Sequence, residues 1–160
     1  MGNRLSSVIA PSFISVHKDI KEGRHTHYWL KGGRGSTKSS FISAELILGI
    51  MRDAQLGLMT NAIVLRRYGV TIRESVYDQL NWAVNALGVA PYWQAGVSPM
   101  QLIYTPTGQK IIFRGVDDAT KIKSVKAGKG YIKYAWYEEA NEFEGPEKIR
   151  SINQSVLRGG

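Results

Sequence analysis

The sequence predicts an α/β fold in which a mainly parallel sheet is flanked by helices and carries an inserted β-hairpin. Three observations predict it. Short apolar runs alternate with stretches whose apolar residues recur at helical spacing. Residues 27–50 consist of a short apolar run, a glycine-rich turn and a stretch with helical spacing. A further apolar run, at 131–139, ends in two carboxylates. The 160 residues, 43% of them apolar, are enough for a single domain covering 1–160.

The first unit of the predicted sheet is a strand, a turn and a helix. Residues 27–30 are aromatic and apolar, as expected of a short buried strand. From Ser39 to Ile50 the apolar residues recur at helical spacing, which predicts a helix. Residues 1–26 precede this unit as a lead-in arm. Because Pro11 interrupts its apolar run, we expect an edge strand or an arm packed on the core.

The next stretch predicts a second strand and a second helix. Residues 62–65 are apolar and largely β-branched, as in a buried strand. Thr71 and Glu74 have the spacing of a capping box, and the apolar stripe that follows ends at Gly88. We expect Trp82 in this helix to be a packing residue.

The middle of the chain predicts the inserted hairpin. Residues 101–104 and 110–114 are two apolar runs that flank a short loop containing glycine. Towards the end of the chain, Pro146 has the position of a first-turn residue in a last helix.

The glycine-rich turn 32–39 matches the phosphate-binding P-loop pattern G-x-x-x-x-G-K-[ST], with Thr37 in place of the second glycine. Backbone N–H groups of such a loop, together with the following helix N-terminus, bind phosphate oxygens. Lys38 would bind the β- and γ-phosphates and Ser39 would bind Mg²⁺. A threonine resists positive φ, so we expect Thr37 to adopt a conformation that β-branched residues tolerate. The alternative is a surface loop, which the flanking strand and helix disfavour.

The run 131–139 resembles a Walker B element. A strand beside the P-loop strand would deliver its last residues next to the γ-phosphate, where one acid holds hydrated Mg²⁺ and the next polarises the attacking water. By position, Glu138 takes the metal role and Glu139 the general-base role. The alternative is a strand end with two solvent-facing acids.

Composition narrows the function classes. Lys and Arg number 21 against 13 acids, and this net charge of +8 favours polyanionic partners such as nucleic acid. The absence of cysteine excludes disulfides and cysteine-based zinc sites. No apolar run approaches the ~20 residues of a membrane span, so no membrane partner is expected.

Taken together, these segments resemble phage terminase large subunits, most closely the PBSX-like type. The resemblance spans residues 28–160 and is carried by GGRGSTKSS, IVLRRYGVTIRESVYDQLNWAVNALG, FRGVDDATKIKS, YAWYEEANEF and SINQSVLRG. It implies an N-terminal RecA-like ATPase of the catalytic-glutamate class, which uses ATP and Mg²⁺ to drive double-stranded DNA into the procapsid. It also implies a homo-oligomeric ring, contacts with a terminase small subunit and a portal protein, and location in the cytoplasm of the infected bacterial host.

The resemblance assigns roles to individual residues. Lys38 and Ser39 would bind phosphate and Mg²⁺, Glu138 would be the Walker B acid and Glu139 the catalytic glutamate. Arg34 matches an arginine that senses or stabilises the γ-phosphate. The implied nucleotide-binding set is Gly32, Gly33, Arg34, Gly35, Ser36, Thr37, Lys38, Ser39 and Ser40. Candidates for a finger offered to a neighbouring subunit, each with a structural salt bridge as the alternative, are Arg66, Arg67, Arg73 and Arg158.

The resemblance also bears on nuclease activity, and two alternative functions stay open. The C-terminal RNase H-like nuclease of the family has no counterpart in residues 1–160, so nuclease activity is not expected. The alternatives to a packaging ATPase are another RecA-like or helicase-type nucleic-acid ATPase, and a nucleotide-binding assembly module that does not hydrolyse ATP.

Overall fold

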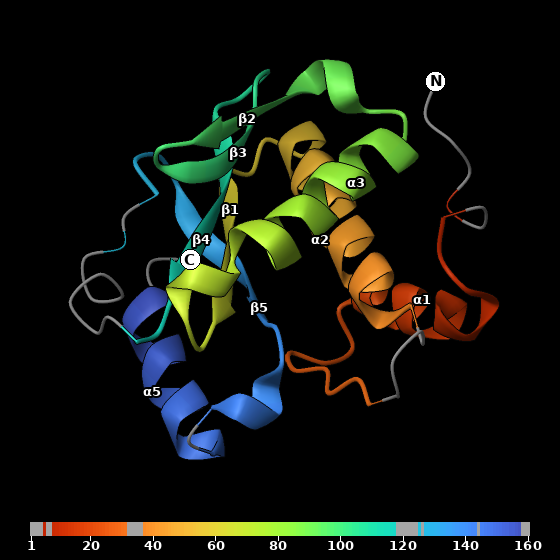
Figure 1. Cartoon of the computed structure of the whole chain (residues 1–160). Helices are drawn as coiled ribbons and strands as arrows, with labels where there is room; N and C mark the ends of the chain where they lie inside the picture. Colours follow the sequence, from red (N-terminus) through yellow and green to blue (C-terminus); the bar gives the residue numbers. More distant parts are fainter. Residues whose placement is uncertain are drawn as a thin grey trace.

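The computed structural model describes residues 5, 8–31, 37–117, 125, 127–143 and 145–157 (Figure 1). The helices are α1 (Ile14–Glu22), α2 (Lys38–Gln55), α3 (Asp78–Ala86) and α5 (Pro146–Val156). The strands are β1 (Thr60–Arg66), β2 (Trp93–Val97), β3 (Met100–Tyr104), β4 (Gln109–Gly115) and β5 (Tyr131–Tyr137). Short helical turns are η2 (Pro11–Phe13), η3 (Gly69–Thr71), η5 (Ala90–Tyr92), η6 (Ala140–Glu142) and the π-helix η4 (Arg73–Tyr77).

The five strands form one mixed, mostly parallel sheet in the order β2-β3-β4-β1-β5. β1 pairs in parallel with β4 and with β5, while β3 is antiparallel to β2 and to β4. The predicted strands at 62–65 and 131–139 and the predicted hairpin are therefore confirmed. β1 lies inside the sheet and is buried on both faces, which explains why its sequence is continuously apolar from Ala62 to Leu65.

Helices cover both faces of this sheet (Figure 1). On one face α2 and α3 pack on Ala62 and Val64 of β1 in the larger core. On the other face α5 packs on Ile63 and Leu65. This three-layer arrangement confirms the predicted α/β class and the helices that start near Ser39 and at Pro146. None of the described helices has the length and apolarity that a membrane span needs.

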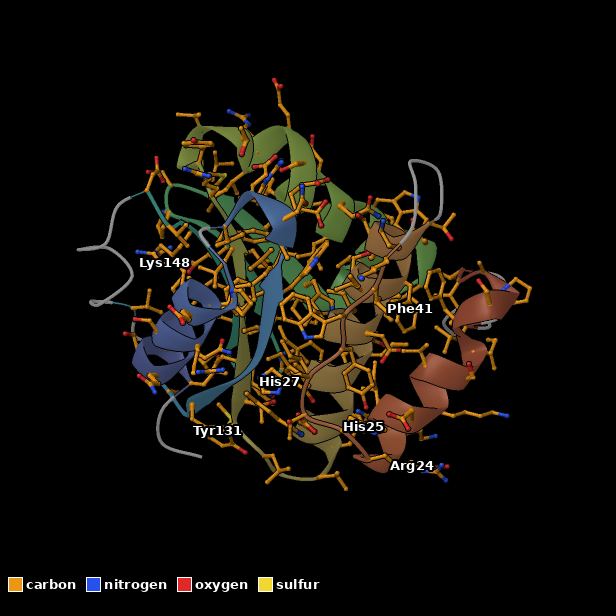
Figure 2. The ribbon with its side chains drawn as sticks, turned by 90° about the horizontal axis from the view of Figure 1, so that it is seen from below. Arg24, His25, His27, Phe41, Tyr131 and Lys148 are labelled. Atoms are coloured by element: carbon orange, nitrogen blue, oxygen red, sulfur yellow. The ribbon has the colours of Figure 1, made fainter. Side chains whose placement is uncertain are left out.

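The stretch before the P-loop differs from the prediction of a strand at 27–30. These residues have no regular secondary structure, and Trp29 is 61% exposed. Figure 2 shows the stretch with His25 and His27 running as an irregular trace from α1 toward the start of α2. The Tyr28 hydroxyl donates to Asp19 Oδ2 on α1 at 2.6 Å. The strand prediction was wrong because the aromatic residues that suggested burial in a sheet are held by α1 or face solvent.

The lead-in arm also contains a helix where an edge strand was one of two expectations. α1 packs beside α2, with the Phe13 and Phe41 rings stacked at a centroid distance of 4.8 Å. His17 Nδ1 contacts Glu45 Oε1 in a partly buried pair. The other expectation, an arm packed on the core, is confirmed.

The helix after β1 does not begin with the predicted capping box. The Thr71 hydroxyl donates to the Tyr68 carbonyl at 2.7 Å and so completes the turn η3. The chain then forms the π-helix η4 before α3 starts at Asp78. The capping prediction failed because Thr71 bonds backward into the turn that leaves the sheet. The predicted stop is correct, since Gly88 has a φ of +72°.

The chain segments just before β1 and β5 are in close backbone contact. The buried Asn61 side chain donates to the carbonyls of Lys129 at 2.8 Å and Tyr131 at 3.2 Å. Between them, Gly130 has a φ of +69° and lies so near Met59 that an added Cβ would be 1.8 Å from the Met59 carbonyl oxygen. Only glycine satisfies both conditions, so β1 and β5 can begin this close together only with glycine at position 130.

Candidate nucleotide-binding site

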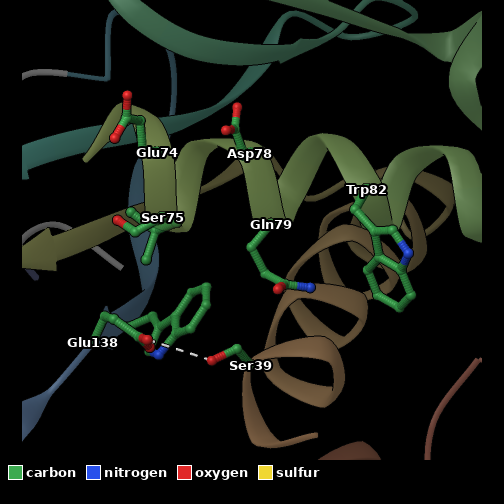
Figure 3. A pocket seen from close by; sticks show the side chains of 9 residues that line it. Ser39, Glu74, Ser75, Asp78, Gln79, Trp82 and Glu138 are labelled. Carbon is green, nitrogen blue, oxygen red and sulfur yellow. Dashed lines mark hydrogen bonds between the residues drawn. The ribbon is translucent and has the colours of Figure 1, made fainter. Parts of the chain in front are cut away.

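The candidate site lies where the first turn of α2 faces the carboxyl end of β5. The Ser39 hydroxyl is 3.4 Å from Glu138 Oε1, to which it donates a weak hydrogen bond. A cavity of about 400 Å³ opens beside this pair (Figure 3). The residues that line it are Ser39, Glu74, Ser75, Val76, Asp78, Gln79, Trp82, Trp136 and Glu138.

The sheet places Glu138 at this point. β5 runs parallel to β1, and the Glu138 N–H continues the ladder by donating to the Leu65 carbonyl at 3.0 Å. Burial, together with the adjacent charge of Glu139, raises the pKa of Glu138 above its ordinary value. The Arg66 charge, the Ser39 hydrogen bond and the Lys38 charge act in the opposite direction. The Glu138 carboxyl and the Ser39 hydroxyl both line the cavity and offer oxygen atoms to a ligand there.

Thr37 departs from its expected conformation. Its φ of +61° and ψ of +17° lie in the left-handed region, where a β-branched residue is strained. The expectation that Thr37 avoids positive φ was therefore wrong. Thr37 thus has a backbone conformation that glycine adopts without strain, and its carbonyl accepts the hydrogen bond of the Phe41 N–H at 3.1 Å, where α2 starts.

Replacing Thr37 by glycine is expected to stabilise the protein by about 1 kcal/mol, because glycine adopts positive φ without steric cost. Thermal unfolding should show a midpoint that is roughly 2–4 °C higher. Thr37→Ala is the matched control, since it removes the side chain but keeps the strain. If glycine stabilises the protein no more than alanine does, the left-handed conformation carries no strain.

Glu139 is the second strained residue at the site. Its φ is +54°, and among the described residues Thr37 and Glu139 are the two non-glycine residues with positive φ. Such strain is concentrated at functional sites. The Glu139 side chain is exposed and does not line the cavity, although Glu138 beside it does. Glu138 therefore faces the cavity, whereas Glu139 faces solvent.

The remaining predicted site residues divide into two groups. Lys38 and Ser40 lie with Ser39 in the first turn of α2. Outside the described residues lie Gly32, Gly33, Arg34, Gly35 and Ser36, which include the predicted γ-phosphate arginine.

The four arginines that are candidates for a finger differ in their surroundings. Arg66 ends β1 beside Glu138 and its Nη1 donates to the Thr71 carbonyl at 3.4 Å. Arg67 Nη1 donates to the Glu142 carbonyl at 2.5 Å, and its guanidinium lies over the Tyr68 ring. Both therefore bond to backbone carbonyls, and among the described residues neither forms the salt bridge that was the alternative to a finger role. Arg73 is exposed, and Arg158 lies outside the described residues.

Sequence reasoning missed the helical wall of the cavity. Ser75, Gln79 and Trp82 come from η4 and α3 and recur at i, i+4 and i+7, which places them on one face. Trp82 was expected to be a packing residue, but it is 42% exposed and lines the cavity. The available signal was the row of polar residues next to the apolar stripe of this helix.

The site has the donor atoms that Mg²⁺ prefers. A hydroxyl and a carboxylate oxygen converge here, and both are hard oxygen ligands. Within the part of the chain that the structure describes, no group of three or more His, Cys, Asp or Glu residues could hold a metal by itself. This fits an ion held by one or two protein ligands, water and substrate phosphates.

Comparison with known proteins adds an independent line of evidence. A family model described as phage terminase large subunit matches residues 24–158. Over 155 residues, or 97% of the chain, the sequence is 42% identical to the terminase large subunit of Bacillus phage SPP1 and covers 36% of that protein. Over 126 residues, or 78% of the chain, it is 30% identical to the PBSX phage terminase large subunit of Bacillus subtilis strain 168, covering 27% of it. The chain thus spans about a third of the length of these relatives.

Proposed function

Because this chain belongs to the phage terminase large subunit family, we propose that it is the ATPase part of a viral DNA-packaging motor. In this proposal it couples ATP hydrolysis to the translocation of double-stranded DNA into the procapsid. The observation that carries the proposal is the convergence of Ser39 and Glu138, 99 residues apart, at the cavity beside the first turn of α2. A hydroxyl after the P-loop lysine and an acid at a strand end are the two halves of a nucleotide–Mg²⁺ site.

The proposal includes a RecA-like P-loop fold. Its support is the parallel arrangement of β4, β1 and β5 between helical layers, with the acids at the carboxyl end of β5. In open α/β sheets, ligands bind at this end of the strands.

In the proposed site each residue has a distinct role. Lys38 binds the β- and γ-phosphates, and Arg34 contacts the γ-phosphate from the loop. Ser39 and Glu138 would hold Mg²⁺, whose positive charge would offset the negative charge that develops on the phosphate oxygens. The remaining loop residues, Gly32 to Ser36 and Thr37, would surround the phosphates with backbone N–H groups.

Glu139 is the proposed general base. Its carboxylate accepts a proton from water as the water oxygen bonds to the γ-phosphorus. The bond from that phosphorus to the β–γ bridging oxygen breaks, which gives ADP and inorganic phosphate. Because Glu139 lies outside the cavity, its side chain has to turn inward before it can act.

DNA, the small subunit, the portal protein and a ring of identical copies are the proposed partners, in the host cytoplasm. The net charge of +8 supports a polyanionic partner. The second candidate function, a nucleotide-binding module without hydrolysis, is favoured by one observation. Glu139 is exposed and does not face the cavity that contains Glu138.

Nucleotide binding is tested by thermal unfolding with and without Mg-ATP. At 100 times its dissociation constant, ATP should stabilise the protein by about 2.7 kcal/mol, which raises the midpoint by several degrees. Lys38→Ala should lose this shift because it removes the phosphate-binding ammonium group. Lys21→Ala, which removes an exposed lysine of α1, is the control and should keep the shift. The same midpoint with and without Mg-ATP in the unmutated protein would overturn the proposed function.

A further inference from the structure

We propose that Gln79 is a further residue of the hydrolysis site, where its side-chain amide orients the attacking water. This inference rests on the proposed ATPase function. Gln79 lies on α3, on the wall of the cavity opposite Ser39 and Glu138, and it belongs to neither the P-loop nor the Walker B element.

The direction of the side chains separates Gln79 from its acidic neighbours. Figure 3 shows Gln79 extending from α3 toward Ser39 and Glu138, whereas the carboxylates of Glu74 and Asp78 point away from them. A triphosphate beside Ser39 would repel carboxylates on the opposite wall. The side chain that faces this position is instead a neutral amide, which can form hydrogen bonds without adding negative charge.

The nitrogen end of the Gln79 amide makes a weak hydrogen bond to α2. Gln79 Nε2 donates to Ser43 Oγ at 3.5 Å, and the Ser43 hydroxyl donates in turn to the Ser40 carbonyl at 3.0 Å. Ser43 is fully buried and lies one helical turn after Ser39 on α2. The same helix that would bind phosphate therefore contacts the Gln79 amide. Among the described residues Gln79 Oε1 accepts no hydrogen bond, and it lies on the Glu138 side of the amide in Figure 3.

The Gln79 Oε1 atom offers the attacking water a hydrogen-bond acceptor. A water molecule that attacks phosphorus must point a lone pair at it, so both of its O–H groups should donate elsewhere. One O–H donates to the general base Glu139, and the other donates to Gln79 Oε1. Glutamine has this water-positioning role in other phosphoryl-transfer enzymes. Gln79 therefore acts on the water and takes no proton itself.

The test is Gln79→Leu, with Asn85→Leu as the matched control. Both substitutions remove a side-chain amide from α3, but Asn85 is exposed, and among the described residues its side chain bonds only to the Asn81 carbonyl. Gln79→Leu should lower kcat for ATP by about 10²-fold, with KM unchanged within about threefold. Asn85→Leu should leave both constants unchanged.

Calorimetry can measure the affinities for ADP and for ADP with fluoroaluminate, and these affinities do not depend on turnover. Gln79→Leu should weaken the affinity for the fluoroaluminate complex, which mimics the transferred phosphoryl group and its water, by at least about tenfold. Its affinity for ADP should stay the same. If Gln79→Leu keeps the unmutated kcat, or if it weakens both ligands equally, Gln79 only joins α3 to α2 and the proposal is overturned. If the unmutated protein neither hydrolyses ATP nor binds the fluoroaluminate complex, the ATPase function itself fails and this inference fails with it.

Discussion

Replacing Glu139 by glutamine is expected to lower ATP turnover by at least about 10²-fold while ATP binding is retained. The substitution keeps the size and shape of the side chain but removes the carboxylate that accepts the proton from water. The phosphate-binding groups on α2 and the acid Glu138 remain in place, so the nucleotide should still stabilise the protein. Steady-state hydrolysis and the thermal shift with Mg-ATP measure these two properties separately.

Glu142→Gln is the matched control for this prediction. Glu142 lies three residues further along, in η6, and has no role in the proposed chemistry. The Glu142→Gln variant should hydrolyse ATP at the rate of the unmutated protein. Unchanged turnover in Glu139→Gln would show that Glu139 is not the base. ATP binding without any turnover in the unmutated protein would favour the nucleotide-binding assembly module.

Replacing Gly130 by alanine is expected to lower the free energy of unfolding by about 3 kcal/mol or more. The new Cβ would lie 1.8 Å from the Met59 carbonyl oxygen and 2.7 Å from Met59 Cβ, so the backbone has to move. That movement would break the hydrogen bond of 3.1 Å from the Tyr131 N–H to the same carbonyl, at the start of β5. Thermal unfolding should show a midpoint lowered by roughly 6–12 °C.

Gly108→Ala separates the two causes of this effect. Gly108 also has a positive φ, of +82°, but an added Cβ there would have no neighbour within 4 Å. It should therefore cost only the conformational strain, about 1 kcal/mol. Equal losses of stability at the two glycines would show that the approach of Gly130 to Met59 does not matter for the fold.

The candidate site could be predicted in part because its chemistry is local in the sequence. Lys38 and Ser39 follow a glycine-rich turn, and Glu138 and Glu139 follow an apolar run, so their residue types and positions are visible without a structure. Gln79 could not be found in this way. It faces Ser39 and Glu138 only because α3 packs beside α2, and its polar row resembles an ordinary solvated helix face.

By itself, the sequence determined the elements whose burial follows a simple period. β1 is apolar throughout because both of its faces are covered, and α2 has a clear helical stripe because one side packs on the sheet. Only the tertiary structure decided the conformations that depend on a distant partner. The stretch 27–30 follows α1 through Asp19, and Thr71 bonds back to Tyr68. Thr37 keeps a left-handed conformation that its side chain disfavours. In each case the tertiary structure imposed a conformation that the local sequence does not favour. A single sequence shows only such local preferences.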